Sequence, residues 1–87
     1  MSKVRGTITA VTPGADRFVI ETSLGLSLCK WYGGSIMIEQ GDAVEGDLHS
    51  FGMHDLKLLD QNDIVRAWIA DFSVSKQQAE AFLRGKS

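Results

Sequence analysis

The residues of this chain best suited to binding chemistry are aromatic side chains that stand beside basic ones. Lys30, Trp31 and Tyr32 are consecutive, and Trp68 follows Arg66 by two positions. Aromatic rings stack on unpaired nucleobases and nearby cations neutralise phosphates, so this combination is typical of single-stranded nucleic-acid binding. With two further arginines expected on the same face, the predicted nucleic-acid-binding residues are Arg5, Arg17, Lys30, Trp31, Tyr32, Arg66 and Trp68.

Metal-binding and nucleophilic chemistry find little support. His49 and His54 are five positions apart and lack the close ligand pairs that tetrahedral zinc sites show. The one cysteine, Cys29, has no base at a supporting spacing, so we expect a buried or half-buried thiol. We predict no metal, no cofactor and no catalytic residue.

Carboxylates are numerous, but many of them fall in turn-like segments, where solvated loop charges are the better interpretation than an acid–base pair. The sequence Gly33-Gly34-Ser35 lacks the spacing and the lysine of a phosphate-binding loop. A chain of 87 residues also offers little room for a deep cleft. We therefore predict a non-enzymatic binding protein.

Length and composition limit the number of domains and the cellular location that we expect. Eighty-seven residues make a single domain, 1–87, with one modest core. One cysteine allows no intrachain disulfide, no apolar run nears the roughly 20 residues of a membrane span, and the first residues lack the apolar stretch of a secretory signal. We expect a cytoplasmic protein without membrane contact.

Charge is distributed unevenly along the chain. The net charge is −2, which argues against a general nucleic-acid binder. Residues 35–63 hold seven acidic side chains and one basic one, whereas the segments on either side each hold four basic and two acidic side chains. If the two outer segments pair in space, one face is basic and the middle segment forms an acidic flank; the alternative is an ordinary solvated surface of mixed sign.

The first third of the chain predicts three short strands. Apolar and polar residues alternate over 4–11, and β-branched residues follow at 18–22 and Leu-rich alternation at 24–31, with turn compositions between them. In the third strand, alternation puts Trp31 on the face opposite Leu24, Leu26 and Leu28, so we expect Trp31 to be exposed. Residues 35–40 are interpreted as either one helical turn or an extended bridge.

The remainder predicts further strands and one helix. A strand with an acidic outer face follows Gly41-Asp42, then come a loop at 51–55, a short strand at 56–59, a turn at 60–63 and a last strand over 64–70. Ser75 and Gln78 match a capping box, which predicts a helix over about 76–84. Such a short helix is marginal alone, so its apolar face should dock on the barrel or on a partner.

This order of elements predicts a mostly β fold with one C-terminal helix: a small antiparallel barrel of five to six strands over about 3–72. A meander, a short connector, the strand Gly-Asp-x-Val-x-Gly at 41–46, a loop and a closing strand together resemble an OB-fold. An SH3-like barrel is the alternative, because the helix follows the strands. The resemblance implies a binding module for oligonucleotides or sugars.

Two functions remain open from the sequence. The first is single-stranded nucleic-acid binding through the basic and aromatic face. The second is protein–protein interaction through the acidic strand at 42–49, a sheet edge or the C-terminal helix. Edge strands in so small a domain also make a homodimer an option.

Overall fold

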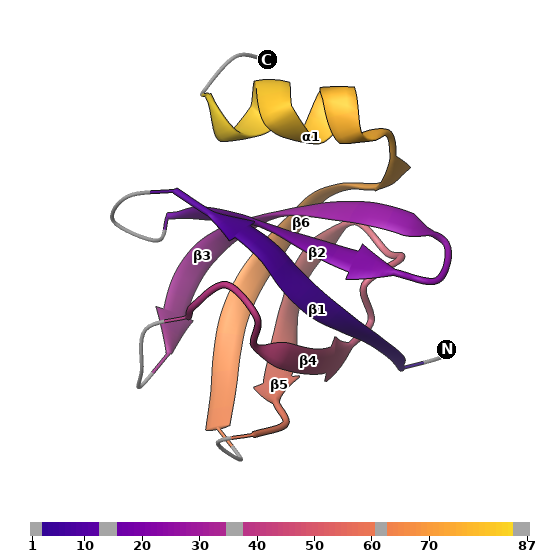
Figure 1. Cartoon of the computed structure of the whole chain (residues 1–87). Helices are drawn as coiled ribbons and strands as arrows, with labels where there is room; N and C mark the ends of the chain where they lie inside the picture. Colours follow the sequence, from indigo (N-terminus) through magenta and orange to yellow (C-terminus); the bar gives the residue numbers. More distant parts are fainter. Residues whose placement is uncertain (1–2, 13–15, 35–37, 61–62, 85–87) are drawn as a thin grey trace.

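The computed structural model describes residues 3–12, 16–34, 38–60 and 63–84. The elements along the chain are β1 (Val4–Val11), β2 (Arg17–Thr22), β3 (Gly25–Gly34), β4 (Ala43–Gly46), β5 (Gly52–Leu58), β6 (Asp63–Val74) and α1 (Lys76–Leu83). The six strands close into an antiparallel barrel in the order β1-β2-β3-β6-β5-β4, and α1 lies across one end of its wall (Figure 1). The predicted mostly β fold with a terminal helix is confirmed.

The barrel consists of two three-stranded meanders. After β3 the chain returns so that β4 pairs with β1, and β6 pairs with β3. This is a Greek-key connection, in which a fourth strand returns beside the first. In the closed order β1 and β6 are separated by two strands in either direction, so they form opposite walls of the barrel.

The interior of the barrel is filled by side chains from all six strands. In β6 the side chains of Val65, Ala67 and Ile69 are buried, whereas Ile64 and Trp68 between them are exposed. This two-residue period is the one predicted from the sequence. The fully or nearly fully buried interior residues are Ile8, Phe18, Ile20, Cys29, Ile38, Val44, Leu48, Leu56, Leu58, Val65, Ala67 and Ile69.

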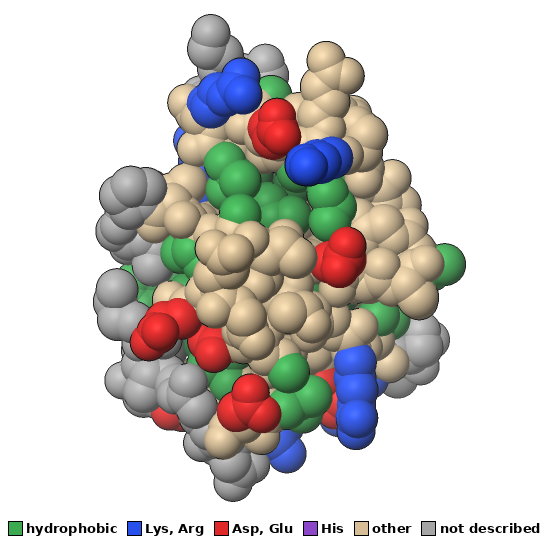
Figure 2. All heavy atoms as spheres, in the orientation of Figure 1, with side chains coloured by type: hydrophobic (Ala, Val, Ile, Leu, Met, Phe, Trp, Pro, Cys, Tyr) green, Lys and Arg blue, Asp and Glu red, His purple; other side chains and the backbone are tan. Residues whose placement is uncertain are grey.

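A second apolar cluster lies outside the barrel wall, under α1. Val19, Leu28, Val74 and Ala79 are buried there, and Phe82 packs against them. Figure 2 shows hydrophobic side chains gathered in the band directly below the helix. The predicted capping box is present, because the Ser75 hydroxyl accepts the Gln78 N–H and the Gln78 side chain accepts the Ser75 N–H. Within this chain, the helix docks on the barrel.

The loop predicted at 51–55 is wrong, because β5 already begins at Gly52. Gly52 has a φ of 107°, which lets the chain turn sharply into the strand. The polar residues His54 and Asp55 do not suggest a strand in the sequence. The strand forms because it pairs continuously with β6, from Gly52↔Ile69 to Leu58↔Asp63. The short strand predicted at 56–59 is the second half of β5.

The connector between β3 and β4 is described only from residue 38. Ile38 is buried, and Glu39–Asp42 form a tight turn in which the Asp42 N–H donates to the Glu39 carbonyl at 3.2 Å. Gly41 has a φ of 99°, as this turn requires. The rest of the predicted helical turn or bridge at 35–40 lies outside the described residues, as do residues 13–15 of the first predicted turn.

Candidate functional site

The outward side of three neighbouring strands forms a solvent-facing sheet surface, which we call the outer face. β6 runs along its centre, with β3 on one side and β5 on the other. The register places Lys30 of β3 and Met53 of β5 on either side of Trp68. The side chains of the outer face are Lys30, Tyr32, Met53, Asp55, Lys57, Ile64, Arg66 and Trp68.

Two aromatic side chains of the outer face are open to solvent. The exposed fraction is 57% for Tyr32 and 42% for Trp68. Lys30 lies directly opposite Trp68, and directly paired positions in a sheet bring Cβ atoms to about 5 Å. The bulge between Trp31 and Gly33 carries Tyr32 next to Arg66, which pairs with Gly33. Both aromatic rings therefore have a cation as neighbour.

A shallow groove of about 310 Å³ crosses the middle of the outer face. Its lining residues are Tyr32, Gly33, Asp55, Ile64 and Arg66. Arg66 donates through Nε to Asp55 Oδ1 at 3.2 Å, and both side chains are more than half exposed. An exposed ion pair of this kind contributes about 0–1 kcal/mol to stability, so it can open or change partners at little cost.

The charges of the outer face are mainly positive. Lys30, Lys57 and Arg66 supply three cations, and Asp55 is the one carboxylate among the side chains assigned to this face. The predicted separation of charge therefore holds in part, although Lys57 comes from the acidic middle segment of the chain. The side chains assigned to the outer face thus carry more positive than negative charge, although Glu45 is paired with Lys57 at its edge and the net charge of the chain is −2.

Trp31 does not belong to the outer face, so the prediction that its side chain is exposed is wrong. It is half-buried and packs against the barrel interior, and its buried Nε1 has no hydrogen-bond partner in the described structure. Alternation along β3 does put Trp31 opposite Leu26 and Leu28. Those leucines, however, point outward and are covered by α1, so the inward face is the one with Trp31.

The Arg17 side chain contacts the end of α1. Its Nη1 donates to the Phe82 carbonyl oxygen at 2.9 Å, and its guanidinium lies 5.3 Å from the centroid of the Phe82 ring. Carbonyl groups in the last turn of a helix lack partners within the helix, so a cation there stabilises the helix end. Arg17 therefore fastens α1 to β2, although the register also places it opposite Lys30.

Arg5 lies on the opposite wall of the barrel from the outer face. It belongs to β1, and its Nε donates to Glu45 Oε2 of β4 at 3.1 Å. The predicted cluster of seven residues is therefore not one surface. Lys30, Tyr32, Arg66 and Trp68 lie together on the outer face, and Arg5 and Trp31 lie elsewhere. Arg17 borders the outer face beside Lys30 but is bound to the end of α1.

Four residues of the outer face were not predicted as part of this surface: Met53, Asp55, Lys57 and Ile64. The first three belong to the half of the molecule where a loop and a short strand were predicted instead of β5. The alternation of Met53, Asp55 and Lys57 with the buried Leu56 and Leu58 was a usable signal. Ile64 lies within the predicted last strand, but an isolated apolar residue gives no indication of binding.

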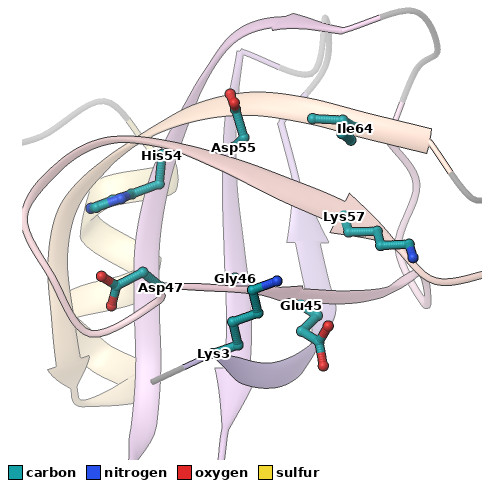
Figure 3. A pocket seen from close by; sticks show the side chains of 8 residues that line it. All are labelled: Lys3, Glu45, Gly46, Asp47, His54, Asp55, Lys57 and Ile64. Atoms are coloured by element: carbon teal, nitrogen blue, oxygen red, sulfur yellow. The ribbon is translucent and has the colours of Figure 1, made fainter. Parts of the chain in front are cut away.

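A larger opening of about 450 Å³ lies where β4 and β5 diverge. Their ladder contains only Val44↔Leu58 and Glu45↔Lys57. In Figure 3 His54 and Asp47 lie toward one end of the opening and Lys57 toward the other. Side chains of both signs mix along it, and His54 Nε2 lies 3.1 Å from the Ser50 carbonyl oxygen. This arrangement favours no particular ligand.

Side chains at one end of the barrel form an aromatic contact of their own. Phe51 is 62% exposed and its ring centroid lies 4.8 Å from that of Phe72, which also contacts His49. His49 Nε2 lies 2.9 Å from Thr22 Oγ1. Within the described ranges, no group of three or more His, Cys, Asp or Glu side chains is placed to hold a metal ion.

Cys29 is fully buried, as predicted for a structural thiol. Burial raises the pKa of this thiol, because the apolar interior disfavours the thiolate. The thiolate is the nucleophilic form, so the barrel interior suppresses cysteine reactivity here. Sγ lies 3.9 Å from the Ser27 carbonyl oxygen, and the Ser27 hydroxyl donates to the Leu48 carbonyl at 2.9 Å.

The helix in the described part of the chain is too short and too polar to cross a membrane. Comparison of the chain with protein-family models, with curated proteins and with solved structures found no match.

Proposed function

We propose that this protein is a non-catalytic module that binds single-stranded nucleic acid through the outer face of β3, β6 and β5. The observation that carries the proposal is the exposure of Tyr32 and Trp68 on one sheet surface, each beside a cation. Stacking of a base on an aromatic ring contributes about 1–3 kcal/mol per base, and it needs rings that no part of the protein covers.

The rigidity of the surface supports the same function. Trp68 and Arg66 belong to a strand paired on both sides, so the backbone beneath them is fixed by two ladders. Lys30 and Lys57 lie at its two flanks, where a phosphate backbone that crosses the strands would pass. A preformed platform loses little conformational entropy when a flexible strand binds.

The barrel also supports the resemblance to OB-folds that the sequence suggested. OB-folds are Greek-key barrels that bind oligonucleotides on a sheet face. This chain has six strands and a helix after the last strand, whereas an OB-fold has five. The proposed similarity to OB-folds is therefore one of architecture and binding mode.

The test is fluorescence anisotropy at low salt with labelled DNA and RNA 12-mers of mixed sequence. We expect Trp68→Ala and Tyr32→Ala each to weaken binding by at least about fivefold, because each removes a stacking platform. Phe51→Ala is the matched control, since Phe51 is an exposed aromatic residue outside the outer face. Absence of binding by the unaltered protein would refute the proposal.

A second candidate is a protein-interaction module that uses the same face. Ile64 and Met53 are exposed apolar side chains beside Arg66 and Trp68, and Trp, Arg and Met are enriched at protein interfaces. The surfaces suggested by the sequence are less available: the apolar side of α1 packs on the barrel, and Glu45 pairs with Arg5. Binding of a protein partner that does not weaken as the salt concentration rises, and that is lost in Ile64→Ser, would favour this candidate.

A further inference from the structure

The groove in the outer face combines an aromatic wall with a hydrogen-bonding pair. Tyr32 and Asp55 lie on either side of Arg66, and Ile64 contributes an apolar surface. A Cβ placed on Gly33 would meet nothing within 4 Å, so open space lies above the backbone there. A volume of about 310 Å³ is at the lower end of small-ligand sites, which suits one planar ring system.

The ion pair leaves both a donor edge and an acceptor available. Arg66 uses Nε to reach Asp55 Oδ1. The Nη1 and Nη2 amino groups of Arg66 and the Oδ2 atom of Asp55 lie outside this hydrogen bond. Because Asp55 accepts from Nε, the two groups present donors and an acceptor next to each other, and this weak exposed ion pair can adjust to a ligand.

The carboxylate indicates which part of a nucleotide the groove accepts. Asp55 would repel a phosphate that approached Arg66, since like charges at close range are unfavourable. A nucleobase edge carries no net charge and offers both N–H donors and carbonyl acceptors. Arg66 and Asp55 are therefore suited to a base, whereas Lys30 and Lys57 at the flanks are suited to phosphates.

We propose that this groove is a nucleobase subsite that prefers guanine; the inference rests on the proposed function. Guanine presents two adjacent donors, N1–H and N2–H, beside the O6 acceptor. The Asp55 carboxylate accepts from both donors, Arg66 donates to O6, and Tyr32 stacks on the ring. Adenine and cytosine offer one amino donor to a carboxylate, and uracil offers one N–H between two carbonyls.

The experiment compares an all-uridine single-stranded RNA 8-mer with four 8-mers of uridine that carry one central guanosine, adenosine, cytidine or inosine. By fluorescence anisotropy the unaltered protein should bind the guanosine oligomer roughly tenfold more tightly than the all-uridine one. Inosine lacks the N2 amino group and should fall between them. In Asp55→Asn the preference for guanosine should disappear while binding to the all-uridine oligomer persists.

Asp60→Asn is the matched control, because the substitution removes the same charge at an exposed residue that lines neither the groove nor the larger opening. It should leave the guanosine preference unchanged. Equal binding of all four oligomers by the unaltered protein would overturn the base subsite and leave the proposed function intact. Failure to bind any oligomer would overturn both. Preference that survives in Asp55→Asn would also refute the role of the carboxylate.

Discussion

Gly6 and Gly33 show how differently the barrel uses glycine at single positions. A Cβ at Gly6 would overlap a methyl group of Ile20 and lie 2.8 Å from the Glu21 carbonyl oxygen, whereas a Cβ at Gly33 would meet nothing within 4 Å. At Gly6 the neighbouring backbone approaches too closely for any side chain. The β1–β2 wall therefore depends on this glycine for its close contact.

We expect Gly6→Ala to lower the free energy of unfolding by about 1–3 kcal/mol, because overpacking against the backbone of β2 cannot be relieved by a rotamer change. Gly33→Ala is the control and should be neutral or slightly stabilising, since alanine restricts the unfolded chain more than glycine does. Urea denaturation followed by tryptophan fluorescence measures both. Equal stability of the two variants would contradict the close packing at Gly6.

At the scale of elements, α1 buries the outward side of β2 and β3, whose inward side is buried in the barrel. It is only eight residues long, and such a helix is marginal in isolation. Its capping box, the bond from Arg17 to the Phe82 carbonyl and the packing of Ala79 on the barrel hold it in place. Val19 and Leu28 are buried outside the barrel wall for this reason.

We expect Ser75→Ala to destabilise the protein by about 1 kcal/mol, because it removes the side-chain acceptor for the Gln78 N–H at the start of α1. Gln77→Ala is the control: Gln77 is exposed in the same helix, and alanine has the highest helix propensity. The midpoint of thermal unfolding by circular dichroism should fall for the first variant only. An unchanged midpoint in Ser75→Ala would mean that the cap does not contribute to the stability of the protein.

At the scale of the whole molecule, closure of the barrel places charged side chains on different walls. The outer face is centred on β6, and the ion pair of Arg5 with Glu45 lies on the opposite wall. The net charge of −2 therefore says little about the charge that a ligand meets on one side.

Salt dependence of oligonucleotide binding follows from this arrangement. If Lys30 and Lys57 contact phosphates and Arg66 contacts a base, the plot of log affinity against log salt should have a slope of about −1.4, or about −0.7 per phosphate for single strands. Lys57→Ala should reduce the slope by about 0.7. Lys76→Ala, a change in α1, should leave it unaltered. A slope near zero would exclude phosphate contacts on the outer face.

Much of this fold was predictable from local patterns. Alternation in residues 4–11 and 64–70, the turn residues between the first strands and the capping box at Ser75 each act over a few positions, and the structure has the corresponding strands and helix. The same alternation placed Arg66 and Trp68 on one face of the last strand but left open whether Trp68 is exposed, which the structure decides.

Local sequence patterns predicted most of the strands, the helix and the proximity of aromatic to basic residues, but not the first half of β5. Tertiary structure decided which face is inside: α1 covers the side of Leu26 and Leu28, which turns Trp31 inward. Barrel closure also paired β3 with β6, which brought Lys30 to Trp68 and Tyr32 beside Arg66. The physical reason is that a two-residue period shows that two faces differ, but only the packing of distant segments determines which one water reaches.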